Sequence, residues 1–120
     1  MSEAGQLRSP LTPQSDKRYP RSFGDLSFLD GKLFSLERLE HRICRRSPTT
    51  GAEEKCWSFA AAALTQERRY PEPYGNAEAL WLDKDGAWLG VDNNDLARAD
   101  GERRPLLWHF KAPAGGWSAP

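Results

Sequence analysis

The sequence of 120 residues predicts one α+β domain, a two-helix hairpin packed on a small antiparallel sheet of about three to five strands. Two patterns support this prediction: a β-hairpin signal at residues 80–91, and helix signals across residues 36–69. Residues 1–20 are rich in Ser, Pro, Gln and charge, and we expect them to be disordered. We expect residues 113–120 to form a flexible tail, which leaves residues 21–112 as the folded domain.

The hairpin signal is an Asp-Gly pair, Asp85-Gly86, between two apolar runs. Asp tolerates and Gly readily adopts the positive φ that a two-residue type I′ turn requires. The resulting register places Asp83 opposite Trp88 and Trp81 opposite Gly90, so both indole rings lie on one face. The other face is aliphatic and consists of Leu80, Leu82, Leu89 and Val91.

Two further extended regions are expected. Residues 23–35 surround a second Asp-Gly pair, Asp30-Gly31, and residues 106–110 form a last strand. The period of two in this strand places Leu106, Trp108 and Phe110 on one face, and Leu107 and His109 on the other.

The first helix is predicted from Leu36 to about Arg46. Ser35 can cap it, and Leu36, Leu39 and Ile43 recur at helical spacing on one face. The Ser47-Pro48 pair then ends it.

The second helix is predicted over residues 50–69. Thr50 and Glu53 match a capping box, four alanines follow at positions 60–63, and Arg68-Arg69 occupy the last turn. With the short linker before it, this helix would complete an αα-hairpin.

A long β-hairpin is the alternative for residues 36–64. With residues 47–53 as its loop, positions that sum to 100 would pair, so that Ile43 meets Trp57, Cys44 meets Cys56 and Arg46 meets Glu54. The alanine run and the Leu/Glu/Arg content favour helices. We therefore expect free thiols, although the hairpin register would permit a Cys44–Cys56 disulfide.

Charge and hydropathy restrict the function classes. The formal net charge is zero, with an excess of +3 over residues 1–50 and of −5 over residues 71–100. No apolar run approaches the roughly 18 residues of a membrane helix, and we see no signal-peptide core. We therefore predict a cytoplasmic protein that does not bind membranes.

Catalytic and metal signals are weak. His41, Cys44, Cys56 and His109 are the candidate zinc ligands, but no second closely spaced pair is present, and strong zinc signatures rest on two such pairs. The sequence gives no sign of a nucleophile with an oriented base, and no phosphate-binding loop. We expect a protein that is not an enzyme and has no cofactor.

Nucleic-acid binding by a helix-turn-helix-like pair is one alternative. It would use the basic residues of the first predicted helix, which are Arg38, Arg42, Arg45 and Arg46. Glu53-Glu54 at the start of the second helix would repel phosphates, which weighs against this alternative.

The indole face of the 80–91 hairpin is the main candidate interface. Two rings beside carboxylates would suit a protein partner with a basic surface. The expected binding residues are Trp81, Asp83, Asp85, Trp88, Asp92 and Asp95. Alternatively, residues 19–34 could cover both rings.

The function expected from this face is that of a small inhibitor or adaptor, such as a phage or mobile-element accessory factor. The remaining alternatives are the nucleic-acid-binding protein and a zinc-stabilised domain.

Overall fold

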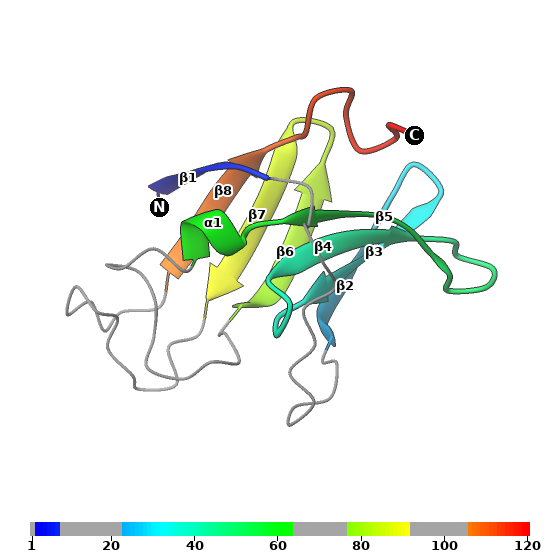
Figure 1. Ribbon diagram of the computed structural model, residues 1–120, viewed down its shortest axis with the longest axis horizontal. Helices are drawn as coiled ribbons and strands as arrows, with labels where there is room; N and C mark the ends of the chain where they lie inside the picture. The colour runs from blue at the N-terminus through cyan, green and yellow to red at the C-terminus, as the bar shows by residue number, and fades with distance from the viewer. Residues whose placement is uncertain (1, 8–22, 64–76, 92–105) are drawn as a thin grey trace.

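The computed structural model describes residues 2–7, 23–63, 77–91 and 106–120, and it consists mostly of β-strands (Figure 1). A first four-stranded sheet has the order β1-β8-β7-β6, and a second has the order β2-β3-β4-β5. The elements are β1 (Ser2–Gln6), β2 (Phe23–Leu29), β3 (Lys32–Glu37), β4 (Arg42–Arg46), β5 (Glu53–Ser58), α1 (Ala60–Ala63), β6 (Ala77–Asp83), β7 (Gly86–Val91) and β8 (Leu106–Lys111).

The predicted α+β class, with a two-helix hairpin on a sheet, is therefore wrong. Residues 42–46 and 53–58 are neighbouring antiparallel strands, and α1 is a single turn of four residues. The alternative long hairpin is the one that forms, because Ile43 pairs with Trp57 and Cys44 pairs with Cys56. Helix propensity amounts to less than about 1 kcal/mol per residue, and pairing across strands that buries large side chains can outweigh it.

The residues that resemble a helix cap instead shape the loop between β4 and β5. The Ser47 hydroxyl accepts hydrogen bonds from the N–H groups of Thr49 and Thr50, and the Thr50 hydroxyl accepts one from Ala52. Gly51 has a φ of +76°, which glycine adopts at low cost. Ser and Thr favour helix caps and turns for the same reason, because their hydroxyls bind nearby backbone N–H groups.

The short helix α1 does use part of the predicted alanine run. Its cap is Ser58, whose hydroxyl accepts a hydrogen bond from Ala60 N. Residues 64–69 of the predicted helix lie outside the described residues.

The Asp30-Gly31 turn between β2 and β3 is confirmed. Its φ values of 50° and 78° are those of a type I′ turn, and Leu29 pairs with Lys32 across it. The expected last strand is also confirmed, with Trp108 and Phe110 buried and Leu107 exposed.

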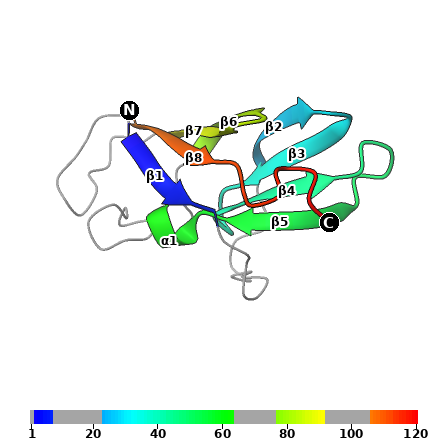
Figure 2. The same ribbon diagram turned by 90° about the horizontal axis from the view of Figure 1, so that it is seen from above.

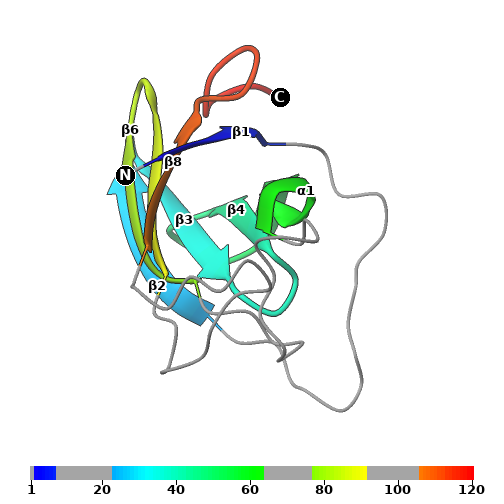
Figure 3. The same cartoon turned by 90° about the vertical axis from the view of Figure 1, so that its left-hand side faces the viewer.

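The two sheets meet where β2 lies beside β6 (Figure 3). Asp25 joins these edges, since its Oδ2 accepts a hydrogen bond of 2.8 Å from Leu80 N. The apolar core lies between the sheets, which Figure 2 shows from above. Its members from the two sheets include Phe34, Ile43, Trp57, Leu89, Trp108 and Phe110.

Both ends of the chain contribute to this structure. Ser2–Gln6, which we expected to be disordered, pairs in parallel with β8, and Leu7 is buried in the core. At the other end, in the segment predicted as a flexible tail, Trp117 is buried against Phe34 and Trp57. No helix among the described ranges has the length and apolarity needed to cross a membrane.

Candidate functional site

The first sheet carries a row of aromatic side chains on its outer face, which points away from the core. Trp81 of β6, Trp88 of β7 and His109 of β8 lie directly opposite one another in the register, and we call them the aromatic row. Trp88 and His109 pack with ring centroids 4.4 Å apart. The side chain of Trp81 is 60% exposed, whereas Trp88 is half-buried.

The neighbouring row on this face consists mainly of residues with little or no side chain. It consists of Ala79, Gly90 and Leu107, of which Leu107 is 45% exposed. Because Ala79 and Gly90 add little beyond the backbone, one side of the aromatic row borders a nearly flat surface.

The hairpin that holds the row differs in register from the prediction. Trp81 faces Trp88 rather than Gly90, and the turn is centred on Lys84-Asp85. The pairing moves by two positions, so every side chain keeps its predicted face. Leu80, Leu82, Leu89 and Val91 are all buried, as the aliphatic face requires.

The Asp83 side chain explains where the turn lies. Its Oδ1 accepts hydrogen bonds from Asp85 N at 2.8 Å and Gly86 N at 2.9 Å, which is an Asx turn. The C-terminal segment fixes the same turn, since Trp117 Nε1 donates to Asp83 O and Ala112 N donates to Asp85 O. The end of the aromatic row is thus held rigidly.

The expected acidic rim is only partly described. Asp83 is committed to the turn through one oxygen, and the exposed Asp85 carboxylate has no ion-pair partner among the described residues. Asp92 and Asp95, also predicted for this site, lie outside the described residues.

His109 belongs to the row, whereas the sequence indicated it only as a possible extension of the Trp patch and not among the expected partner-binding residues. The alternation of residues 106–110 already placed it on the outer face, but its neighbour Trp88 could not be known without the strand order. Gly86 makes room for it, since a Cβ there would lie 2.6 Å from His109 Nε2.

A second set of exposed apolar side chains lies on β2. Phe23, Leu26 and Phe28 are 56%, 54% and 64% exposed. They did not appear in the predicted site, because the alternation in this strand is irregular. A bulge between Phe23 and Asp25 accounts for that irregularity.

The four arginines predicted for nucleic-acid contact are all bound to other groups of the chain. Arg42 and Arg46 pair with Glu37, Arg45 pairs with Glu54, and Arg38 pairs with Glu78. Arg45 also donates to the carbonyl oxygens of Trp117 and Ala119. Helix-turn-helix geometry is absent from the described residues, because these arginines lie on β4 and in the turn before it.

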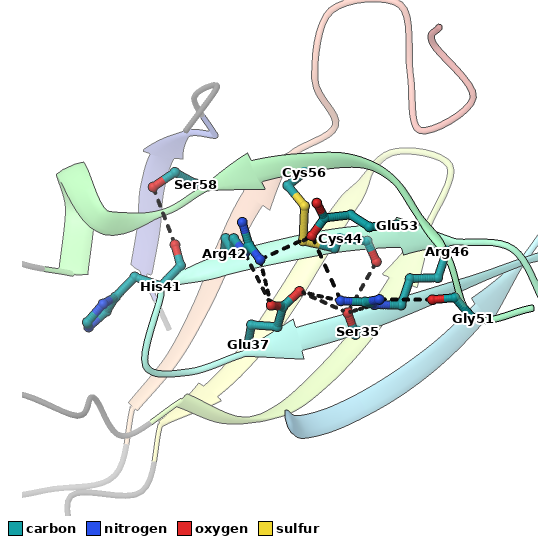
Figure 4. Close-up of a disulfide and its surroundings, with 10 residues drawn as sticks. All are labelled: Ser35, Glu37, His41, Arg42, Cys44, Arg46, Gly51, Glu53, Cys56 and Ser58. Carbon is teal, nitrogen blue, oxygen red and sulfur yellow. Dashed lines mark hydrogen bonds and ion pairs between the residues drawn. A yellow bond between two sulfur atoms is a disulfide. The ribbon is translucent and has the colours of Figure 1, made fainter. Parts of the chain in front are cut away.

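The outer face of the second sheet carries polar side chains that are buried and bound to one another. Glu37 is fully buried, and its Oε1 accepts two hydrogen bonds from Arg42, at 3.2 and 2.9 Å. Its Oε2 accepts hydrogen bonds from Ser35 and Arg46. Figure 4 shows these side chains around a disulfide between Cys44 and Cys56, with Glu53 beside it. We call Ser35, Glu37, Arg42, Arg46, Glu53 and the disulfide the polar cluster.

The expectation of free thiols is therefore wrong. The register places Cys44 and Cys56 directly opposite each other, with Cα atoms 4.1 Å apart. The four predicted zinc ligands do not converge. His41 packs edge-on against Phe59 and points away from the disulfide, and His109 lies on the other sheet.

Two titratable groups on the second sheet have shifted pKa values. Burial lowers the pKa of His41 below its ordinary value of 6.5, although a hydrogen bond with the Leu39 backbone opposes this. The pKa of Glu54 is also lowered, mainly by its hydrogen bond with Lys32 and further by Arg45.

Comparisons of the sequence with protein-family models and with curated proteins, and of the structure with solved structures, gave no match. The described residues define a protein of two β-sheets with an exposed aromatic row on one of them.

Proposed function

We propose that this protein is a small binding protein whose aromatic row docks a protein partner through a cationic side chain. The observation that carries the proposal is the 60% exposure of Trp81 at the edge of a rigid, well-packed hairpin. Large apolar groups cost free energy when they face water, and exposed aromatics are enriched where proteins bind each other.

The local chemistry favours an arginine or lysine from the partner. An indole ring attracts a cation placed over its face, by about 0.5 to 2 kcal/mol depending on desolvation. The Asp85 carboxylate, which has no ion-pair partner among the described residues, and Oδ2 of Asp83 lie in the adjoining turn. Lys84 and Lys111 are exposed nearby, so a partner with a uniformly basic surface fits less well than one with a single cation among apolar groups.

Rigidity supports this role. The row is held by cross-strand pairing, by the Asx turn at Asp83 and by the contact of Trp117 with that turn. A preorganised surface loses little side-chain entropy when it binds, and therefore keeps more of the contact energy as affinity. An inhibitor or adaptor of the phage accessory type, as expected from the sequence, would act in this way.

The test compares three forms of the protein in affinity capture from source cells, followed by titration of the captured protein in purified form. We expect Trp81→Ala to weaken the dissociation constant at least tenfold, because centrally packed Trp residues dominate interfaces. Phe23→Ala is the matched control, because Phe23 is a similarly exposed aromatic residue but lies at the start of β2, where its ring contacts Arg46 of the second sheet.

Two results decide the proposal. A partner that binds the wild type and Phe23→Ala equally, but Trp81→Ala weakly, supports it. Binding that Trp81→Ala leaves unchanged contradicts it. The thermal midpoint of Trp81→Ala should stay near that of the wild type, since exposed substitutions change stability by about 0.5 kcal/mol or less.

A further inference from the structure

The polar cluster contains four groups that can bind a metal ion. One ligand atom from each of Glu37, Cys44, Glu53 and Cys56 lies within 4.8 Å of the others. These residues come from three neighbouring strands, so the register of the second sheet brings them together (Figure 4). In the structure the two sulfur atoms are bonded to each other.

We propose that reduction of the Cys44–Cys56 disulfide converts the polar cluster into a zinc site with two thiolate and two carboxylate ligands. Thiolate sulfur and carboxylate oxygen are both zinc ligands, and four of them suffice for its tetrahedral coordination. The proposal is independent of the aromatic row and of any partner bound there.

The chemistry balances in two steps. A dithiol or phosphine reductant supplies two electrons and is itself oxidised, while the S–S bond breaks and the sulfurs take up two protons as thiols. Zn²⁺ then displaces those two protons and forms two Zn–S bonds. The carboxylates of Glu37 and Glu53 complete the coordination without releasing protons.

Charge balance favours this exchange. The disulfide is neutral, and a zinc ion with two thiolates is also neutral overall. The two carboxylates therefore face the same net charge in both forms, together with Arg42 and Arg46. Because unpaired charge is costly in a buried site, a substitution that preserves net charge leaves the surrounding ion pairs intact.

Glu53 provides both the most available ligand and the path of entry. Its side chain is 41% exposed, and its Oε1 lies 3.6 Å from Cys44 Sγ. Both oxygens of Glu37 already accept hydrogen bonds, but a carboxylate oxygen has more than one lone pair and can keep one donor while it binds a metal.

The zinc ion would take over the structural role of the disulfide. Both link β4 to β5 at the same pair of opposing positions. Disulfides persist in oxidising compartments and are rare in reducing ones, whereas thiolate–zinc sites are stable in the latter. The same cluster could thus hold the two strands together under either condition.

The experiment uses the full chain, reduced with a phosphine and then freed of reductant without oxygen. Titration with Co²⁺, as a spectroscopic substitute for Zn²⁺, should give thiolate charge-transfer absorption that saturates at one ion per chain. Zn²⁺ should displace the cobalt and raise the thermal midpoint of the reduced protein. The oxidised protein should bind at least a hundredfold more weakly.

Glu53→Gln and Glu54→Gln form a matched pair of variants. Glu53 belongs to the cluster, whereas Glu54 is paired with Lys32 and Arg45. We expect Glu53→Gln to weaken zinc binding at least tenfold and Glu54→Gln to leave it unchanged. The proposal is overturned if the reduced protein binds less than about a tenth of an equivalent, if the oxidised protein binds equally well, or if Glu53→Gln binds like the wild type.

Discussion

The two sheets use their outer faces in opposite ways. On the second sheet, Glu37 is fully buried and Arg42 is 5% exposed, and their charges meet in the polar cluster. On the first sheet, the aromatic side chain of Trp81 is 60% exposed. Charged side chains are thus buried where they are paired, whereas the aromatic side chain of Trp81 faces water although its strand is paired with β7.

The strand sequences explain this difference. β4 reads Arg-Ile-Cys-Arg-Arg, and its arginines find carboxylates on both neighbouring strands. β7 reads Gly-Ala-Trp-Leu-Gly-Val, and its outer face has only Trp88 between two glycines. The first pattern closes its face with long side chains, and the second leaves its face flat.

The largest expected effect comes from opening the polar cluster. Glu37→Gln leaves Arg42 and Arg46 without their buried counter-charge, and we expect the free energy of unfolding to fall by about 3–5 kcal/mol. Urea denaturation followed by fluorescence would measure the loss. The control is Glu78→Gln, which breaks the more exposed pair with Arg38 and should cost under about 1 kcal/mol. Equal losses in the two variants would show that the buried ion pairs of the polar cluster contribute no more stability than an exposed pair.

Removing the covalent link in the cluster should have the next largest effect. Cys44 and Cys56 are 12 residues apart, and closing a loop of this size stabilises a protein by about 3 kcal/mol in the chain-entropy model. We expect reduction in the presence of a metal chelator to lower the free energy of unfolding by about that amount. A reduced protein as stable as the oxidised one would show that strand pairing and ion pairs hold β4 to β5 without the covalent link.

Local pattern predicted the first sheet better than the second. Alternation gave the correct faces of β6, β7 and β8, because residues 80–82, 87–91 and 107–110 alternate between a buried face and a more exposed one. The exact pairing of β6 with β7 was off by two positions, since the Asp83 side chain rather than Asp85-Gly86 determines the turn.

The second sheet could not be deduced from composition. Arg42, Arg45 and Arg46 resemble the end of a helix, and only their pairing with Glu37, Glu53 and Glu54 makes them suitable for a buried strand. The sequence did indicate, as the alternative, a hairpin in which the numbers of paired residues add up to 100. It fits Cys44 and Cys56, but a bulge after Arg45 moves Arg46 from Glu54 to Glu53.

A substitution beside His109 tests whether Gly86 is needed to hold this ring in the aromatic row. Gly86→Ala places a methyl group against the carbonyl oxygen of Phe110 and 2.6 Å from His109 Nε2. Since backbone cannot move aside easily, we expect a loss of about 1–3 kcal/mol and a displaced His109 ring.

Gly90→Ala is the matched control on the same strand. Its added Cβ would meet only Ala79 Cβ, at 3.0 Å, so the loss should be smaller. Thermal unfolding gives the stability difference, and the imidazole proton shifts of His109 report the displacement. A Gly86→Ala protein with unchanged shifts would show that the ring does not depend on this glycine.

The smallest expected effect is a loss of stability at mildly acidic pH that depends on His41. His41 lies in the turn between β3 and β4 with a φ of 54°, and burial lowers its pKa below the ordinary value of 6.5. Below that value the unfolded chain takes up a proton that the folded protein does not. The free energy of unfolding should therefore fall as the pH drops from about 6.5 towards the lowered pKa, by at most about 1.4 kcal/mol per pH unit.

His41→Asn isolates this contribution, because Asn tolerates a positive φ and does not titrate. Glu54, whose pKa is lowered in the folded protein, is present in both proteins, so its protonation cancels when their urea denaturation is compared between pH 7.5 and about 5. The wild type should lose more stability across this interval than His41→Asn does. If both lose stability in parallel, His41 gains its proton equally in the folded and unfolded states, and burial in this turn does not lower its pKa.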